Sequence, residues 1–172
     1  PRIDRTYALL PNTNCGACGF AGCRAFAEAL IRGQVSPAQC TVSPAAAQQR
    51  IAAMLGVDVG RHAKRVARLA CAGGSNVARY RGRYRGLPSG RGAGQAGGGG
   101  KACSWGCLGL GDCARACTFD AIRMDEHDLP VVNEQCCTAC GDCVEICPKD
   151  LFSLHPVEHR LWVACSSQAV GD

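Results

Sequence analysis

The segment Cys137-Thr-Ala-Cys140-Gly-Asp-Cys143-Val-Glu-Ile-Cys147-Pro148 decides the fold of the C-terminal half of this chain. Its cysteines have the spacing in which three thiolates bind one 4Fe-4S cluster and the fourth binds a second cluster. An iron-sulfur cage needs several soft thiolates converging on one small site, and a tight loop supplies most of them. The spacing therefore predicts that this segment serves two clusters.

The same segment recurs 30 residues earlier at a constant offset, which identifies an internal repeat. The earlier copy places Gly111, Cys113, Cys117, Asp120, Ile122 and Met124 opposite Gly141, Cys143, Cys147, Asp150, Phe152 and Leu154. Cys107 stands opposite Cys137, whereas Leu110 stands opposite Cys140 and offers no thiol. Cys103, four residues before Cys107, is the simplest source of the missing ligand.

We predict that the two halves of the repeat exchange their last cysteines, because the fourth cysteine of such a run binds the other cluster. One cluster is then held by Cys103, Cys107, Cys113 and Cys147. The other is held by Cys117, Cys137, Cys140 and Cys143.

A third set of four cysteines lies near the N-terminus, as Cys15-x2-Cys18-x4-Cys23 followed by Cys40. Glycines between these positions allow positive φ and bring amide N–H groups toward a cluster. We therefore expect three 4Fe-4S clusters in the chain, held by twelve of its fifteen cysteines. The alternatives for Cys15 and Cys18 are a zinc half-site or a redox pair. No histidine has ligand spacing nearby and no βαβ pattern surrounds the pair, so both are disfavoured.

The elements predicted around these loops give an α+β fold class, with a small helical 4Fe-4S domain followed by a bacterial-type two-cluster ferredoxin module. Apolar spacing predicts a helix after Cys23 that ends at Gly33. A second helix is expected to start at Ser43 as N-cap and to stop at Gly56, with Ala47, Ile51, Met54 and Leu55 on its apolar face. Short strands are expected at residues 121–124, 131–133 and 151–154, and an end strand is expected to include residues 161–163.

Three cysteines remain outside these sets: Cys71, Cys136 and Cys165. The odd number of cysteines, the crowded Cys-x2-Cys loops and the lack of a signal-peptide pattern disfavour extracellular disulfides. A reducing, cytoplasmic setting is favoured. Cys136 adjoins a predicted ligand, but the constant repeat offset favours Cys137. We interpret Cys71 and Cys165 as ordinary buried thiols.

The charge of the chain is unevenly distributed. Its formal net charge is +5, but three oxidised clusters with their thiolates would add about minus six. No acidic residue lies between Val59 and Gly111, a segment rich in arginine and lysine. This segment is a cationic connector that docks a partner, folds over the anionic loops, or is simply solvated.

Within the connector, residues 79–86 resemble an arginine-glycine RNA-binding tract. The single short copy is weak evidence, and no nucleic-acid partner is expected. Residues 86–100 are glycine-rich and are expected to form a flexible linker. They match neither a dinucleotide-binding nor a P-loop motif in the required context. The four histidines form no catalytic pattern, and no apolar stretch is long enough for a membrane span.

These features divide the chain into three parts. We expect an N-terminal 4Fe-4S domain at residues 1–58, a basic, glycine-rich connector at 59–100 and a two-cluster ferredoxin-like domain at 101–172.

Three stretches together resemble the B subunit of Rnf-type complexes: the run from Leu10 to Cys23, the run from Lys101 to Cys113, and Val163-Ala-Cys-Ser-Ser167. The resemblance covers nearly the whole chain. It implies a polyferredoxin that takes electrons from soluble ferredoxin within a membrane-bound, ion-pumping ferredoxin:NAD oxidoreductase. Gly90 stands where the resemblance leads us to expect a cysteine.

The resemblance implies an electron-transfer subunit with no catalytic residues of its own, and whether the chain counts as an enzyme is left open. Its expected partners are other subunits of an oxidoreductase complex and a ferredoxin-type carrier, at the cytoplasmic face of the plasma membrane. Relatives usually begin with an anchoring helix that is not seen here, so membrane contact is expected only through partners or a missing anchor. The alternatives are a wiring subunit of a soluble or electron-bifurcating oxidoreductase, and a zinc-stabilised RNA-binding protein.

Overall fold

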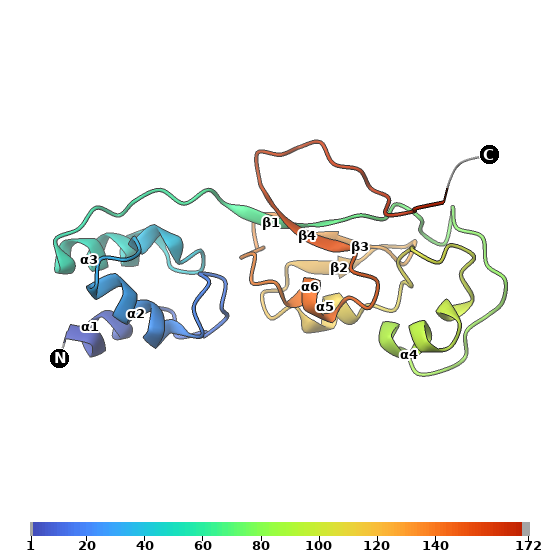
Figure 1. Cartoon of the computed structure of the whole chain (residues 1–172), viewed down its shortest axis with the longest axis horizontal. Coiled ribbons are helices and arrows are strands. Elements are labelled where there is room, and N and C mark those ends of the chain that lie inside the picture. Colours follow the sequence, from blue (N-terminus) through green and yellow to red (C-terminus); the bar gives the residue numbers. More distant parts are fainter. Residues whose placement is uncertain (1, 170–172) are drawn as a thin grey trace. The chain divides into compact units, whose positions relative to one another are not determined.

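The computed structural model describes residues 2–169 of the 172-residue chain. It combines short helices with two small antiparallel sheets, which confirms the mixed helix-and-sheet class (Figure 1). The chain forms two compact units. The first holds residues 2–64 together with Thr138–Cys140, and the second holds Arg65–Cys137 and residues 141–169.

The first unit is helical. It contains α1 (Arg2–Ala8), α2 (Cys23–Ile31), the 3-10 helix η1 (Pro37–Gln39) and α3 (Ala45–Leu55). Its core is built on Phe26, Leu30 and Ile51, which are fully buried. Phe20, from the cysteine-rich loop, packs against Phe26 with ring centroids 5.6 Å apart. The apolar core therefore lies directly beneath the loop that carries the first cysteines.

Both helices predicted for this unit are present, with differences at the second. Helix α3 begins at Ala45 with Pro44 as its N-cap, and not with Ser43. The Pro44 carbonyl accepts the amides of Ala47 and Gln48, so this residue starts the helix without a side-chain cap. The helix ends at Gly56 as predicted, with φ of 70° there.

The second unit contains the two sheets and a pair of five-residue helices. Strand β1 (Arg65–Leu69) pairs antiparallel with β4 (Phe152–Pro156), and β2 (Ile122–Met124) pairs antiparallel with β3 (Pro130–Val132). The helices α5 (Asp112–Ala116) and α6 (Asp142–Ile146) each follow a glycine with a left-handed backbone, Gly111 and Gly141. The internal repeat predicted from the sequence is thus visible as two matching helix-and-strand segments (Figure 1).

The strands expected near residues 121, 131 and 151 are present within a residue or two. The end strand expected at residues 161–163 is wrong. Strand β4 pairs instead with β1, whose Val66 and Ala67 are buried, whereas Leu161 is 95% exposed. The terminal segment is held by a side-chain contact: the Arg68 guanidinium lies 4.4 Å from the centroid of the Trp162 ring. Apolar burial therefore selects β1 as the partner strand.

Part of the glycine-rich stretch expected to be a flexible linker forms two short helices, α4 (Gly90–Gln95) and η2 (Gly98–Gly100). Ser89 caps α4 by accepting a hydrogen bond from the Gly92 amide at 3.4 Å. Within residues 2–169, no helix has both the length and the apolar character needed to cross a membrane. The domain boundaries at residues 58 and 100 stay predictions.

The two faces of α3 provide a test of the first core. Ile51 is fully buried, whereas Met54, one turn along the same helix, is 40% exposed. We expect Ile51→Ala to lower the free energy of unfolding by about 2–5 kcal/mol, because it leaves a cavity. Met54→Ala is the matched control and should cost less than about 1 kcal/mol. Urea unfolding followed by circular dichroism measures both, and equal costs would contradict this packing.

Candidate metal centres

In the first unit, the four cysteines of the N-terminal set line one pocket. These are Cys15, Cys18, Cys23 and Cys40. Cys23 is the first residue of α2, and Cys40 directly follows η1. Helices therefore position the last two cysteines of the set. Both of these thiols are buried, while Cys15 and Cys18 are half-buried. The structure therefore brings together all four thiols of this predicted set.

Side-chain amides hold the segments that carry these thiols. Asn14, which has a positive φ of 48°, accepts the Cys23 amide with its Oδ1 at 2.9 Å. A Cβ on Gly22 would lie 2.9 Å from the same oxygen, so a larger residue there would displace Asn14. Gln39 Nε2 donates to the Cys18 carbonyl at 2.9 Å, and Gln48 Nε2 donates to the Cys40 carbonyl at 3.0 Å.

The electrostatics of this pocket oppose bare thiolates. Burial raises the pKa of Cys18, and the charges of Cys40 and Cys15 raise it further. Each thiolate therefore makes the next one harder to form. A positively charged iron core would remove this cost, because bound cations deprotonate their thiol ligands.

In the second unit, three of the predicted ligands line one pocket: Cys107, Cys113 and Cys147. Cys113 lies in α5, and Cys147 is the residue that ends α6. Burial raises the pKa of Cys113 to about 11, with added contributions from the charges of Cys107 and Cys147. The fourth predicted ligand, Cys103, is exposed and does not line this pocket.

The remaining predicted set is Cys117, Cys137, Cys140 and Cys143. Cys143 is buried in α6, and the other three are half-buried. Cys117, Cys137 and Cys143 belong to an apolar cluster with Ile122 and Phe152, and the same cluster contains Cys113 and Cys147 of the other set. Cys140 lies in the loop between Cys137 and Cys143. The crossed arrangement of ligands stays a prediction.

The two halves of the repeat give their last cysteines the same hydrogen bond. The Ala121 amide donates to Cys117 Sγ at 3.3 Å, and the Leu151 amide donates to Cys147 Sγ at 3.4 Å. The Ala67 amide of β1 donates to Cys137 Sγ at 3.5 Å. Hydrogen bonds from backbone amides to a cysteine sulfur stabilise a thiolate that binds iron and tune the reduction potential of the cluster.

The donor set of the first unit fits the iron-sulfur group that it implies. In the described part of the chain, no group of three or more His, Cys, Asp or Glu side chains is arranged to hold a single metal ion. A 4Fe-4S core instead binds four separate thiolates at the corners of a wider cage. Four thiols lining one pocket, with no other ligand type among its lining residues, meet that requirement.

Sequence reasoning missed two residues of the second unit. Cys71 is half-buried, and its Sγ accepts the Cys107 amide at 3.3 Å. Lys101 is 8% exposed, and its Nζ donates to the carbonyls of Gly73 and Cys107. The sequence signal that could have identified Cys71 is its position two residues after a strand. Cys165, interpreted as a buried thiol, is in fact exposed.

Comparison with known proteins finds an iron-sulfur family match over the N-terminal cysteines and relatives over most of the chain. A family model described as "Putative Fe-S cluster" matches residues 10–42. The chain is 40% identical over 165 residues to the B subunit of the Na(+)-translocating ferredoxin:NAD(+) oxidoreductase complex of Acetobacterium woodii, covering 96% of this chain and 50% of the relative. It is 37% identical over 172 residues to the B subunit of the proton-translocating ferredoxin:NAD(+) oxidoreductase complex of Clostridium ljungdahlii, covering 99% and 61%.

A third relative is the B subunit of the ion-translocating oxidoreductase complex of Methanosarcina acetivorans, 39% identical over 140 residues, or 81% of this chain and 53% of the relative. The chain thus spans between half and about three fifths of the length of these relatives. The resemblance noted in the sequence and its iron-sulfur character are confirmed.

The Asn14 contact gives a test of the N-terminal site. Asn14→Ala removes the acceptor of the Cys23 amide, a loss of about 1 kcal/mol, and should speed iron release from this site about fivefold. Asn12→Ala is the matched control, because Asn12 also has positive φ but makes no such bond to Cys23. Iron release to a chelator measures both. Equal rates for the two variants would rule out this role for the Asn14 side chain.

Proposed function

We infer the function of this chain from its homology with the B subunits of ion-translocating oxidoreductase complexes. We propose that it relays electrons between a soluble ferredoxin-type carrier and the other subunits of such a complex, at the cytoplasmic face of the membrane. The single observation that carries this proposal is the pocket of the first unit, which is lined by four thiols. All four lie within residues 10–42, which match a family model described as "Putative Fe-S cluster".

The proposed relay contains three 4Fe-4S clusters, one in the N-terminal domain and two in a ferredoxin-type module. When bound, each cluster accepts and releases one electron without making a bond to a substrate. The chain supplies the thiolates that bind iron, the amides that donate to their sulfurs, and apolar walls. Leu69 and Phe152 line the pocket of Cys113, which limits the access of water to that site.

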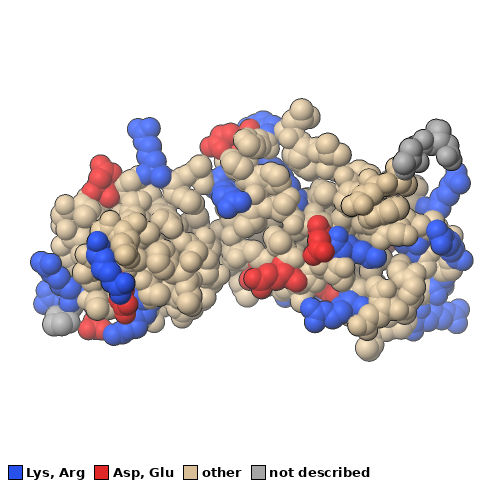
Figure 2. Space-filling model, viewed as in Figure 1, with Lys and Arg blue, Asp and Glu red and all other residues tan. Residues whose placement is uncertain are grey.

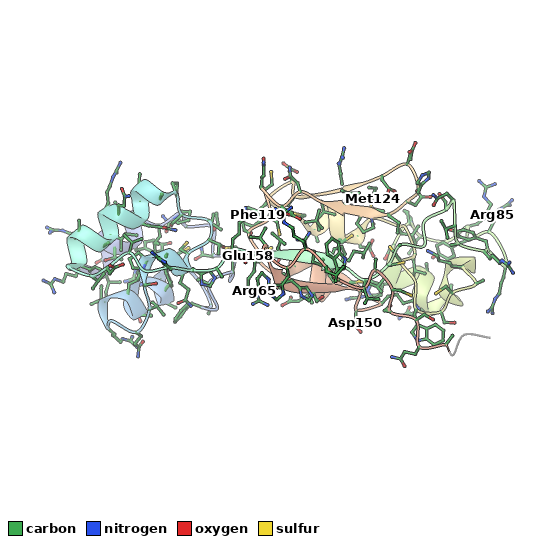
Figure 3. The ribbon with its side chains drawn as sticks, turned by 90° about the horizontal axis from the view of Figure 1, so that it is seen from above. Arg65, Arg85, Phe119, Met124, Asp150 and Glu158 are labelled. Atoms are coloured by element: carbon green, nitrogen blue, oxygen red, sulfur yellow. The ribbon has the colours of Figure 1, made fainter. Side chains whose placement is uncertain are left out.

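The surface of the second unit supports a docking site for an acidic carrier. Arg79, Arg81, Arg83, Arg85 and Arg91 are all exposed. Figure 2 shows basic side chains around the end of this unit that carries α4, and Figure 3 shows Arg85 extending outward there. A single-sign patch of this kind attracts an oppositely charged partner and speeds its association. We propose that it receives an acidic ferredoxin.

A reductive titration tests the relay. We expect the anaerobically purified chain to take up about three electrons, one for each of three clusters, from a dithionite-reduced two-cluster ferredoxin. Bleaching of the visible absorbance and new signals in electron paramagnetic resonance report the uptake. A chain that carries its clusters but takes no electrons from any low-potential carrier would refute the relay.

Charge reversal tests the docking site. We expect Arg83→Glu combined with Arg85→Glu to lower the second-order rate of electron uptake from ferredoxin about tenfold at low salt, with the difference shrinking at high salt. Arg2→Glu combined with Arg5→Glu is the control, because it makes the same change of charge at exposed positions in the first unit. Equal rates for the two double variants would contradict docking at the arginine patch.

A further inference from the structure

We propose that Cys71, and not Cys103, is the fourth ligand of the cluster bound by Cys107, Cys113 and Cys147. This inference rests on the proposed function, because it concerns one of the three clusters. It changes the ligand set that the spacing of the repeat predicts, and it gives a role to a residue that lies 32 positions before the nearest other cysteine of the second unit.

Contacts join Cys71 to this site. Its sulfur accepts two backbone amides, from Cys107 at 3.3 Å and from Gly73 at 3.4 Å. The ligand candidates Cys117, Cys137 and Cys147 also accept backbone amides at their sulfurs. The exposed Cys165 accepts one from Ser167, two residues on, so the contact that links Cys71 to the site is the one from Cys107. Leu69, two residues before Cys71 at the end of β1, lines the pocket of the other three ligands, and Cys71 lines a second pocket that Leu69 also borders. Cys71 therefore reaches this site through its contact with the Cys107 amide.

Burial divides the fifteen cysteines into two groups. Three are exposed, namely Cys103, Cys136 and Cys165, and the other twelve are buried or half-buried. Three cubane sites require twelve thiolates. With Cys71 as a ligand, the three sites use all twelve shielded thiols and no exposed one. If Cys103 were the ligand instead, one site would use an exposed thiol, and the shielded thiol of Cys71 would bind no cluster.

The topology explains the missing ligand in the repeat. In the second half, β3 leads to Cys137, and the loop then continues to α6. In the first half, β1 leads to Cys71, and residues 72–106 separate it from the loop that enters α5. Cys71 then matches Cys137 as the ligand that follows a strand, although the constant sequence offset sets Cys107 opposite Cys137. Cys107 then supplies the ligand that Cys140 supplies in the second half, and the set is complete without a thiol at Leu110.

Lys101 ties the two segments together. Its Nζ donates to the Gly73 carbonyl, close to Cys71 in the chain, and to the Cys107 carbonyl at 2.6 Å. The Lys101 side chain is buried. Lys101 therefore connects the segment that follows Cys71 to Cys107, although a long insertion separates the two cysteines in the sequence.

Differential alkylation of the wild-type holoprotein tests the assignment. The full chain is treated with iodoacetamide anaerobically, first with its iron bound and then after chelation, and each cysteine is read by peptide mass spectrometry. We expect Cys103, Cys136 and Cys165 to be labelled at once, and Cys71 to be labelled only after iron is removed. Immediate labelling of Cys71 with Cys103 protected, in a protein that retains its iron, would overturn the inference.

Paired variants give an independent readout. We expect Cys71→Ser to lose about a third of the iron and acid-labile sulfide, or about four irons of twelve, while Cys103→Ser retains all of both. Cys165→Ser is a further control at an exposed thiol. The reverse pattern overturns the ligand assignment and leaves the relay standing. A wild-type chain without sulfide overturns the relay and the assignment together. If Cys71→Ser does not fold, the alkylation of the wild-type protein decides.

Discussion

The burial of neighbouring thiols is the constraint on which the rest of this structure depends. Burial raises the pKa of Cys113 to about 11 in the second unit and raises the pKa of Cys18 in the first, and the charges of neighbouring thiolates add to both effects. Such a pocket is stable with protonated thiols, or with a cationic core bound to the thiolates. The apolar cores are thin, since only 5% of the residues are aromatic. We therefore expect cluster binding to supply much of the stability of the fold.

The fold meets this constraint by placing backbone amides at the sulfurs. The repeat does so twice with the same geometry, since the amide four residues after each of Cys117 and Cys147 donates to its sulfur. Glycines with left-handed backbones start both short helices and turn the loops toward these thiols. Most basic residues of the second unit lie at its surface, and the buried Arg68 and Lys101 are exceptions.

Local sequence patterns predicted most of the features that depend on residues close together in the chain. Cysteine spacing identified the four thiols that share the first pocket, and apolar spacing identified α2 and α3 to within a residue or two. The contacts of long sequence separation were not predictable in this way. The partner of β4 is β1, more than 80 residues away, because Val66 and Ala67 become buried there and Leu161 does not. Cys71 was missed for the same reason, since an insertion hides its place in the repeat.

The most direct measurement is the content of iron, acid-labile sulfide and zinc per chain in anaerobically purified protein. Three cubane sites predict about twelve irons with matching sulfide and no zinc. Zinc without sulfide would contradict the three-cluster relay, because the same thiols would then bind single ions and could carry no electrons.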